Sequence, residues 1–396
     1  MDEMIRIAVV GAGNRAAWAV GALRGLPSTF HVAAVVDEIP DRARLLASHY
    51  EVSTRSIFGS LRDCLRHNDL DAVAVFTPDS AHAAVVLPAL MAHKHVFVEK
   101  PLEVTRQRMQ QIIDADQRAG GRTFVGFNLR FAPMYAMCRE LIELGVVGRV
   151  FTIQADDFYD GGRTYFRRWN RLRSMGGGLF VTKACHDFDL VYWLTGGAKP
   201  ISVSASGSLG YYKPLAQAAM YCRDCALRDG CADRYELHVK PGSLVHRLNQ
   251  VTERFAGQRP DLCVYNSEKD TIDHGAAMVT FQNGIVATYT LNVVTGFSNR
   301  RLRVAGSKAT IDADLSRSHI TIHHRDPARL EEFTVGDPDQ LHGGGDDELF
   351  PAFAAFVRGE RDPAKYVSPA EAAVAVKIGL AAQESMESGE VVRLTS

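Results

Sequence analysis

Apolar and polar positions in the first part of the chain follow two alternating periods. Short apolar runs, rich in β-branched residues, are separated by segments in which apolar residues recur at helical spacing. Strands that alternate with helices in this way form a parallel sheet with helices on both faces. We therefore predict a doubly wound α/β domain over residues 1–128. Its strands are expected at Ile5–Val10, Val32–Val36, Ala72–Phe76, His95–Val98 and Arg122–Phe127.

The pattern changes after residue 128. Strand-like runs are now joined by tight turns, most clearly Ala276–Phe281 and Ile285–Val293 around Asn283-Gly284. We predict an α+β domain over residues 129–396 with an open, mostly antiparallel sheet, an insertion at 207–260 and a C-terminal helix able to pack back on the first domain. Its helices are expected at Pro133–Glu143, Met175–Leu194, Asp347–Arg358 and Pro369–Ser388, and its other strands at Arg149–Ala155, Arg301–Val304, Ala309–Ala313, Ser318–His323 and Glu331–Val335.

The first strand runs into a glycine-rich turn and a helix, and the second strand ends on an acidic residue. Gly11 permits the tight bend, Gly13 lets a pyrophosphate approach the backbone, and Ala16 lets the helix pack near the strand. The free N–H groups and the positive dipole end of that helix face the phosphates. This unit predicts a Rossmann dinucleotide-binding site. Its expected contacts are Gly11, Gly13, Asn14, Arg15, Ala16 and Asp37.

Asp37 also predicts which dinucleotide is bound. A carboxylate at the tip of the second strand accepts hydrogen bonds from both ribose hydroxyl groups of an adenosine. A 2′-phosphate would meet the like charges of Asp37 and Glu38, with no adjacent arginine to neutralise them. We therefore predict NAD rather than NADP.

The bulk composition argues against several classes of protein. The chain has 396 residues, too many for one hydrophobic core, and a formal net charge of -1. This balance argues against a partner that is a nucleic acid or a membrane surface. No apolar run is long enough to span a bilayer, and the N-terminus lacks the pattern of a secretory signal. We expect a cytoplasmic protein.

The seven cysteines favour reduced thiols or metal ligands over a disulfide framework. Cys222, Cys225 and Cys231 supply three thiolates within a short stretch, and Cys263 is the best candidate for a fourth. We predict a structural zinc site with tetrahedral geometry in the insertion. Four thiols without metal, or with an opportunistic disulfide, are the alternative.

Several motifs together extend over nearly the whole chain. They are the Gly-Ala-Gly-Asn-Arg turn, the tripeptide Glu99-Lys100-Pro101, the segment from Gly176 to Asp189 with three glycines and His-x-x-Asp, the Gln-Asn-Gly hairpin, and the strand Glu390–Leu394. This combination resembles the Gfo/Idh/MocA oxidoreductases, the family of glucose-fructose oxidoreductase and inositol dehydrogenase. The resemblance implies a cleft where NAD(P) meets a small-molecule sugar, polyol or glycoside. It also implies a homodimer or homotetramer through the open sheet.

The resemblance places further residues beside the nicotinamide. Lys100 stands at the ligand-facing end of a strand, and the peptide bond before Pro101 is expected to be cis. Thr77, Pro78 and His82 follow the preceding strand end and are expected to line the same side. For His82, an ordinary place at a helix N-terminus is equally favoured. Glu99 and Lys100 complete the predicted cofactor contacts.

One segment departs from the family pattern. Many members carry an aspartate four residues before the helix histidine, where this chain has Thr182 followed by Lys183. On one helix these two residues, His186 and Asp189 would lie near one face. We expect the first three to contact substrate and Asp189 to support the helix. The preceding loop is predicted to stack on a sugar and bind its hydroxyl groups, with a solvated loop as the alternative; its residues are Tyr159, Arg163, Arg167 and Trp169.

Oxidation of a secondary alcohol needs a base for the hydroxyl proton and a cation for the negative charge that develops on oxygen. We assign the cation to Lys100 and the base to His186, because an ordinary histidine pKa of about 6.5 permits both protonation states. Lys183 is the alternative base. The sequence thus predicts an NAD-dependent sugar or polyol dehydrogenase. The alternatives are a redox glycosidase or epimerase that retains NAD, and an NAD-sensing regulator without chemistry.

Overall fold

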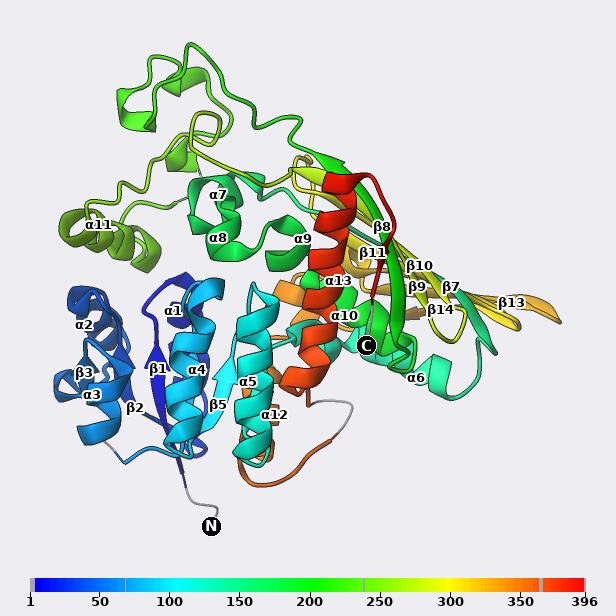
Figure 1. Ribbon diagram of the computed structural model, residues 1–396, viewed down its shortest axis with the longest axis horizontal. Coiled ribbons are helices and arrows are strands. Elements are labelled where there is room, and N and C mark those ends of the chain that lie inside the picture. The colour runs from blue at the N-terminus through cyan, green and yellow to red at the C-terminus, as the bar shows by residue number, and fades with distance from the viewer. Residues whose placement is uncertain (1–3, 68, 238, 363–365, 395–396) are drawn as a thin grey trace.

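The computed structural model describes residues 4–67, 69–237, 239–362 and 366–394. Two sheets lie side by side, and a long irregular segment arches over the top of the molecule (Figure 1). The first sheet has six strands and the second has nine. Among the described helices, none combines the length and apolar character that a membrane span requires.

The first sheet is parallel throughout, with the strand order β3-β2-β1-β4-β5-β6. In this doubly wound order, ligands bind at the carboxyl ends of the strands where the order reverses, beside β1. The predicted α/β fold is therefore confirmed, and only the short β3 was not expected. The strands are β1 Ile5–Val10, β2 Phe30–Val36, β3 Ile57–Phe58, β4 Ala72–Val75, β5 His95–Val98 and β6 Thr123–Val125.

The helices that follow these strands cover both faces of the first sheet. They are α1 Asn14–Arg24, α2 Pro40–His49, α3 Leu61–His67, α4 His82–Met91 and α5 Arg106–Arg118. A sixth helix, α12 (Leu349–Val357), comes from far along the chain. Its Phe353 packs against Phe97 of β5 and Phe124 of β6. A segment close to the C-terminus thus completes the core of the first domain.

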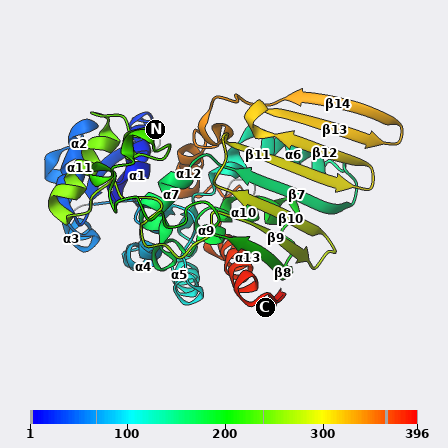
Figure 2. The same ribbon diagram turned by 90° about the horizontal axis from the view of Figure 1, so that it is seen from above.

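The second sheet is mostly antiparallel, in the order β14-β13-β12-β11-β7-β10-β9-β8-β15, with one parallel pair, β7 and β10. Figure 2 shows these strands side by side. Gly284 has a φ of 86°, as the tight turn between β9 and β10 requires. The strands are β7 Val150–Phe158, β8 Pro200–Ser208, β9 His274–Phe281, β10 Val286–Asn292, β11 Asn299–Gly306, β12 Ala309–Asp314, β13 His319–Arg325, β14 Ala328–Thr334 and β15 Val392–Arg393.

Helices cover one face of this second sheet. They include α6 (Pro133–Glu143), α10 (Cys185–Leu194) and α13 (Pro369–Ser388), and the last two contact β7 and β8 respectively. The opposite face carries Met278, Thr288 and Gln154 in one cross-strand row. All three side chains are exposed. The predicted open sheet is therefore present.

The single long helix predicted at Met175–Leu194 is wrong. The segment forms α8 (Arg173–Gly176), α9 (Leu179–Thr182) and α10, after another short helix, α7 (Gly162–Arg167). Gly177 and Gly178 have φ values of 73° and 84°, which end α8. A second break at Lys183 and Ala184 separates α9 from α10. The breaks bring the Lys183 backbone out of the helical register that the sequence pattern suggested.

The predicted insertion leaves the second sheet after β8. It is irregular apart from three short 3₁₀ turns, one helix, α11 (Leu244–Ala256), and an isolated bridge between Tyr221 and Leu262. Ser243 caps α11 by accepting a hydrogen bond from the His246 N–H, and Gly257 ends it with a φ of 65°. The helix is therefore a defined element within an otherwise extended segment.

Candidate active site

The turn after β1 has the features of a phosphate-binding turn. Gly11 has a φ of 92°, and a Cβ there would lie 2.8 Å from the carbonyl carbon of Phe76. Gly13 is the N-cap of α1 and offers no side chain to the first helical N–H groups. No acidic residue lies in the first turn of α1. These residues therefore fit a dinucleotide whose phosphates bind the free N–H groups.

Asp37 lies at the end of β2, as predicted, and is only 6% exposed. Its Oδ2 accepts from the Ala12 N–H at 2.6 Å and its Oδ1 from the Ile39 N–H at 2.9 Å. These bonds hold the carboxylate beside the glycine turn. The expectation that no arginine is adjacent is wrong, because Arg42 Nε lies 3.9 Å from Asp37 Oδ2. Arg42 comes one helical turn into α2, a spacing that the sequence argument did not weigh.

Arg15 and Glu99 contact each other. Arg15 Nε lies 2.5 Å from Glu99 Oε1, and its Nη2 lies 2.7 Å from Asp346 Oδ1. Despite burial of the guanidinium, the two carboxylates raise its pKa. These contacts tie the first turn, the end of β5 and the approach to α12 together. Both side chains therefore support the site, and their direct contact with the cofactor stays a prediction.

Lys100 stands at the carboxyl end of β5, and the Lys100-Pro101 peptide is cis as expected. The Lys100 Nζ donates to the carbonyl oxygen of Thr182 at 3.0 Å. Asp79 follows β4 and is only 5% exposed. Burial raises its pKa to about 8 although the nearby Lys100 charge opposes this. At neutral pH the Asp79 carboxyl is mostly protonated and leaves the charge of Lys100 uncompensated.

His82 does not line an open surface. The side chain is 0% exposed, and its Nδ1 lies 2.9 Å from the carbonyl oxygen of Pro101. The histidine therefore holds the loop that carries Lys100 and Pro101, and the alternative of an ordinary buried position at the start of α4 is the better description. Thr77 and Pro78 lie at the end of β4, and the Thr77 hydroxyl is buried with no partner among the described residues.

Lys183 belongs to a buried chain of charges from three elements. Its Nζ lies 3.1 Å from Asp157 Oδ2 on β7, which also receives Arg300 Nη2 from β11 at 2.7 Å. Arg300 Nε continues to Asp187 on α10 at 3.1 Å. Burial, aided by the charge of Arg300, lowers the pKa of Lys183 to about 8 in spite of Asp157. An amine with this pKa gives up its proton around pH 8.

His186 lies near these two lysines and is only 5% exposed. Its Nδ1 has no hydrogen-bond partner within the described part of the chain. Burial and then the charge of Lys100 lower its pKa well below the ordinary histidine value. The imidazole is therefore neutral. The ring of His342 lies 6.0 Å away, centre to centre.

Thr182 and Asp189, which were predicted to share a helix face with Lys183 and His186, contact other parts of the structure. The Thr182 hydroxyl accepts from Asn170 at 3.1 Å, while its carbonyl receives Lys100. Asp189 forms a bidentate pair with Arg130, at 2.7 Å for both bonds. Asp189 therefore supports the helix, as expected, and does not share a face with Lys183. The prediction of one four-residue face is wrong because the break at Lys183 and Ala184 rotates α10 relative to α9.

The two arginines of the loop predicted to bind sugar contact the insertion and the segment that follows it. Arg163 Nε lies 3.1 Å from Asp233, and Arg167 donates to the carbonyl oxygens of Asp233 and Leu262 at 2.6 and 3.0 Å. Both guanidinium groups thus hold the insertion onto the second domain. Trp169 lies beside Gly176 and is partly exposed. It remains available for stacking, as does the Tyr159 ring, whose centre lies 3.9 Å from Lys183 Nζ.

The structure does not support the zinc prediction. In the ranges that the structure describes, no three His, Cys, Asp or Glu side chains gather as a metal site. Cys222, Cys225, Cys231 and Cys263 are all free thiols. A guanidinium nitrogen of Arg167 lies 3.8 Å from Cys222 Sγ, so a zinc ion there would meet a like charge. The close spacing in sequence does not become a convergence of the sulfur atoms.

Four residues of this region were not found from the sequence. Asp79, Asp157 and His342 carry ordinary local patterns, and only the fold brings them to Lys100, Lys183 and His186. His342 has a φ of 52° in a glycine-rich loop, and its Nδ1 lies 2.8 Å from Asp346. The run His-Gly-Gly-Gly-Asp-Asp was a usable signal, because glycines beside polar residues mark close backbone approach. The fourth residue, Arg168, is exposed.

Two family models match the chain. A model of an oxidoreductase family, covering its NAD-binding Rossmann fold, matches residues 5–127. A model of the C-terminal alpha/beta domain of that oxidoreductase family matches residues 139–394. The two matches meet in the region between Phe127 and Arg139.

Individual proteins are similar over parts or all of the chain. The oxidoreductase named YteT of Bacillus subtilis (strain 168) is 28% identical over 311 residues, 72% of each chain. The inositol 2-dehydrogenase of Rhizobium meliloti (strain 1021) is 29% identical over 220 residues, 55% of this chain and 62% of that protein. The WlbA dehydrogenase from Bordetella pertussis, solved with NADH and UDP-GlcNAcA, has the same fold, with a TM-score of 0.70 and 20% identity over 100% of both chains.

Proposed function

The chain belongs to the Gfo/Idh/MocA oxidoreductase family, and we propose that it transfers a hydride between NAD and a secondary hydroxyl group of a sugar, polyol or glycoside. The observation that carries this proposal is the grouping of Lys100, Lys183 and His186 beside the end of a strand that neighbours the dinucleotide turn. All three are at least partly buried. Family relatives named as inositol dehydrogenases support the class of substrate.

Lys100 is proposed as the cation that stabilises negative charge on the substrate oxygen. NAD, when bound, supplies the hydride acceptor. The substrate hydroxyl must develop alkoxide character before its carbon gives up hydride, and a fixed ammonium in a water-poor site lowers the energy of that charge. The protonated Asp79 leaves the Lys100 charge uncompensated, and the Thr182 carbonyl holds the Nζ in place.

Lys183 is proposed as the group that accepts the hydroxyl proton. Its pKa of about 8 lies near an ordinary working pH, where a general base is most effective. His186 has a much lower proton affinity because it is buried near several cations. The other ring nitrogen of His186, Nε2, instead forms a hydrogen bond with a substrate hydroxyl and orients it. The sequence alone predicts His186 as the base and Lys183 as the alternative, and the structure favours the reverse.

The class of reaction is tested with a substrate panel. Purified enzyme with NAD is mixed with inositols, free sugars, sugar alcohols and glycosides, and NADH is read by absorbance or fluorescence. We expect NADH to form with at least one member of the panel. Lys100→Met serves as the control for contaminating dehydrogenases. NADH formed equally by the variant and the wild type would contradict the proposed site.

NAD is expected to be preferred over NADP, because a 2′-phosphate would replace ribose hydroxyls beside the buried Asp37 carboxylate. Asp37→Ala should gain NADP use, since it also frees Arg42 from its ion pair for the 2′-phosphate. The double variant Asp37→Ala/Arg42→Met is the matched control and should lose that gain. Catalytic efficiencies with the two cofactors decide the question. Equal catalytic efficiencies of the wild type with NAD and with NADP would contradict the prediction.

A homodimer or homotetramer through the open face of the second sheet is also proposed. This face is mostly polar, with Met278 of β9 exposed at 46%. Met278→Arg places a charge where a second copy would pack and should shift the mass in solution, measured by light scattering, toward the monomer. Met91→Arg, at an exposed position on α4 of the first domain, is the control for surface charge alone. A wild-type monomer at micromolar concentration would argue against the interface.

A further inference from the structure

The insertion does not stay on the domain from which it emerges. Its helix α11 contacts α1 and α2 of the first domain. In Figure 1, α11 lies over the upper ends of these helices, at the edge of the sheet where β1 and β2 end. That edge carries the glycine turn and Asp37. The insertion thus connects the two domains across the predicted cofactor site.

Apolar side chains fix α11 to the first domain. Leu248 is 2% exposed and joins the same hydrophobic cluster as Ala16, Ala47 and Val52. Leu244, one turn earlier, packs against that cluster as well. Phe255, on the last turn, is 52% exposed. One face of the helix is therefore docked, and its last turn projects into solvent.

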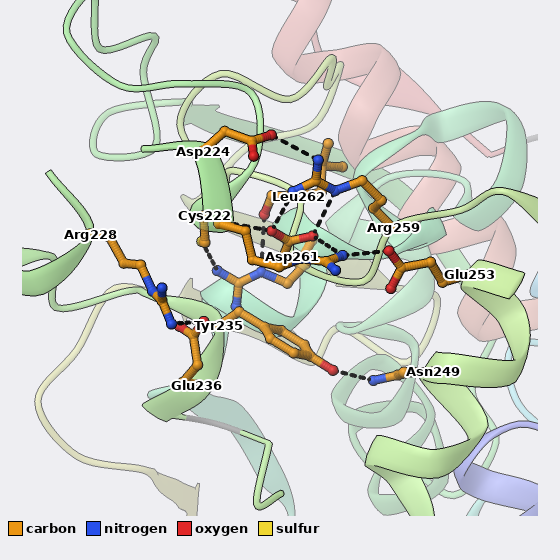
Figure 3. Close-up of polar contacts among 12 residues, drawn as sticks. Cys222, Asp224, Arg228, Tyr235, Glu236, Asn249, Glu253, Arg259, Asp261 and Leu262 are labelled. Atoms are coloured by element: carbon orange, nitrogen blue, oxygen red, sulfur yellow. Dashed lines mark hydrogen bonds and ion pairs between the residues drawn. The ribbon is translucent and has the colours of Figure 1, made fainter. Parts of the chain in front are cut away.

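Polar contacts fix α11 to the rest of the insertion, as Figure 3 shows. The Tyr235 hydroxyl accepts from Asn249 at 2.8 Å, and Arg223 lies 2.6 Å from Glu253. Arg223 also contacts Asp261, which receives Arg259 at 2.9 Å. Asp261 is nearly fully buried, and these two cations hold its pKa below the ordinary value. The insertion is a cross-linked unit and not a loose loop.

The second domain holds the other end of this unit. Arg167 on α7 donates to the backbone carbonyls of Asp233 and Leu262. The Asp233 side chain receives Arg163 at 3.1 Å and the Tyr265 hydroxyl at 2.5 Å. Because Asp233 is 3% exposed, breaking these bonds would leave a buried charge without partners. The connection between α7 and α11 is therefore firm at both ends.

The covered area coincides with the adenosine end of the cofactor site. Arg42 Nη2 lies close to Gly13: a Cβ added to Gly13 would be 3.3 Å from it. Arg42 also pairs with Asp37. Arg168 is exposed, and Arg42 and Tyr235 are near enough for their charges to act on it. Among the described residues, Arg168 has no acidic partner.

We propose that the insertion is the outer wall of the cofactor site and that α11 sets how fast the dinucleotide leaves. The wall covers the adenosine half. The cofactor leaves only after α11 separates from α1 and α2. This inference rests on the proposed function and extends it to the exchange of NADH for NAD after each turnover.

The test measures how fast the cofactor leaves. Enzyme loaded with NADH is mixed with a large excess of NAD, and the loss of bound-NADH fluorescence gives the dissociation rate. Leu248→Glu should speed dissociation by about tenfold or more, because a buried leucine is replaced by a charge. Phe255→Glu, on the same helix but exposed, is the matched control and should leave the rate unchanged.

A second variant avoids any disturbance of the hydrophobic cluster. Tyr235→Phe removes only the hydrogen bond to Asn249 and should speed dissociation about threefold. Equal rates in wild type, Leu248→Glu, Tyr235→Phe and Phe255→Glu would overturn the inference while leaving the proposed function intact. Failure of the wild type to bind NADH at all would overturn both. A faster rate in the first two variants alone supports the wall.

Discussion

The catalytic efficiency of alcohol oxidation is expected to rise about tenfold per pH unit below pH 8 and to stop rising near pH 8, where Asp79 ionises and begins to compensate the charge of Lys100. Lys183 must lose its proton before it can accept one from the substrate. Burial, aided by Arg300, lowers its pKa to about 8, so the unprotonated fraction grows with pH up to that value. The sign follows because the charged ammonium is the inactive form of a base.

Lys183→Met should remove this rise and lower kcat by about 10²- to 10⁴-fold, the usual contribution of a general base. His186→Asn keeps a hydrogen-bond acceptor and should mainly raise KM, with the pH dependence of kcat/KM retained. The profile is measured from pH 6 to pH 10 with the best substrate of the panel and saturating NAD. If the catalytic efficiency of the wild type does not change above pH 7 and His186→Asn is inactive, His186 and not Lys183 is the base.

Lys100→Met should lower kcat by about 10²- to 10³-fold while the NADH dissociation constant stays nearly unchanged. The variant removes the charge that faces the substrate oxygen but leaves the nucleotide turn and Asp37 in place. It also removes the donor to the Thr182 carbonyl, so thermal unfolding is followed in parallel. Lys377→Met, an exposed position on α13, is the matched control.

An equal loss of NADH binding and of turnover in Lys100→Met would contradict this role, because it would make Lys100 a cofactor-binding group. Full activity of the variant would contradict it more strongly. A drop in kcat alone separates stabilisation of the developing charge from binding, since only interactions stronger in the transition state raise the rate.

Much of the fold follows from local pattern. The strands of the first sheet, the hairpin turn at Gly284 and the helices α6 and α13 lie where periodicity and turn residues predict them. Each of these elements is determined by residues that are close together in the sequence. Lys100 and Lys183 are predicted from sequence for a related reason, because strand ends and short motifs are local, and their roles stay proposals.

The wrong predictions concern contacts between residues that lie far apart in the sequence. Helical spacing suggested one continuous helix through His186, but Gly177 and Gly178 adopt left-handed φ values there. Arg163 and Arg167 looked free for a sugar until the fold brought Asp233 to them. Their partners lie in the insertion, far along the chain.

The electrostatic argument changed for the same reason. His186 was assigned as the base from its ordinary pKa, and the sequence gives no sign that Lys100, Arg300, His342 and Lys183 all lie near it. Likewise, Asp157 comes from a strand that pairs with β11 only in the folded sheet, where it meets Arg300. A pKa depends on these tertiary neighbours and on burial.

The central claim is that a substrate hydroxyl carbon gives its hydride to NAD in this site. It is tested most directly by mixing enzyme saturated with NAD and an excess of the best substrate, carrying hydrogen or deuterium on the reacting carbon, and following a single turnover. We predict a rapid rise of enzyme-bound NADH that is slower with deuterium and is at least about 100-fold slower in Lys100→Met and Lys183→Met. Enzyme that binds NAD yet shows no NADH signal with any member of the panel would contradict the account.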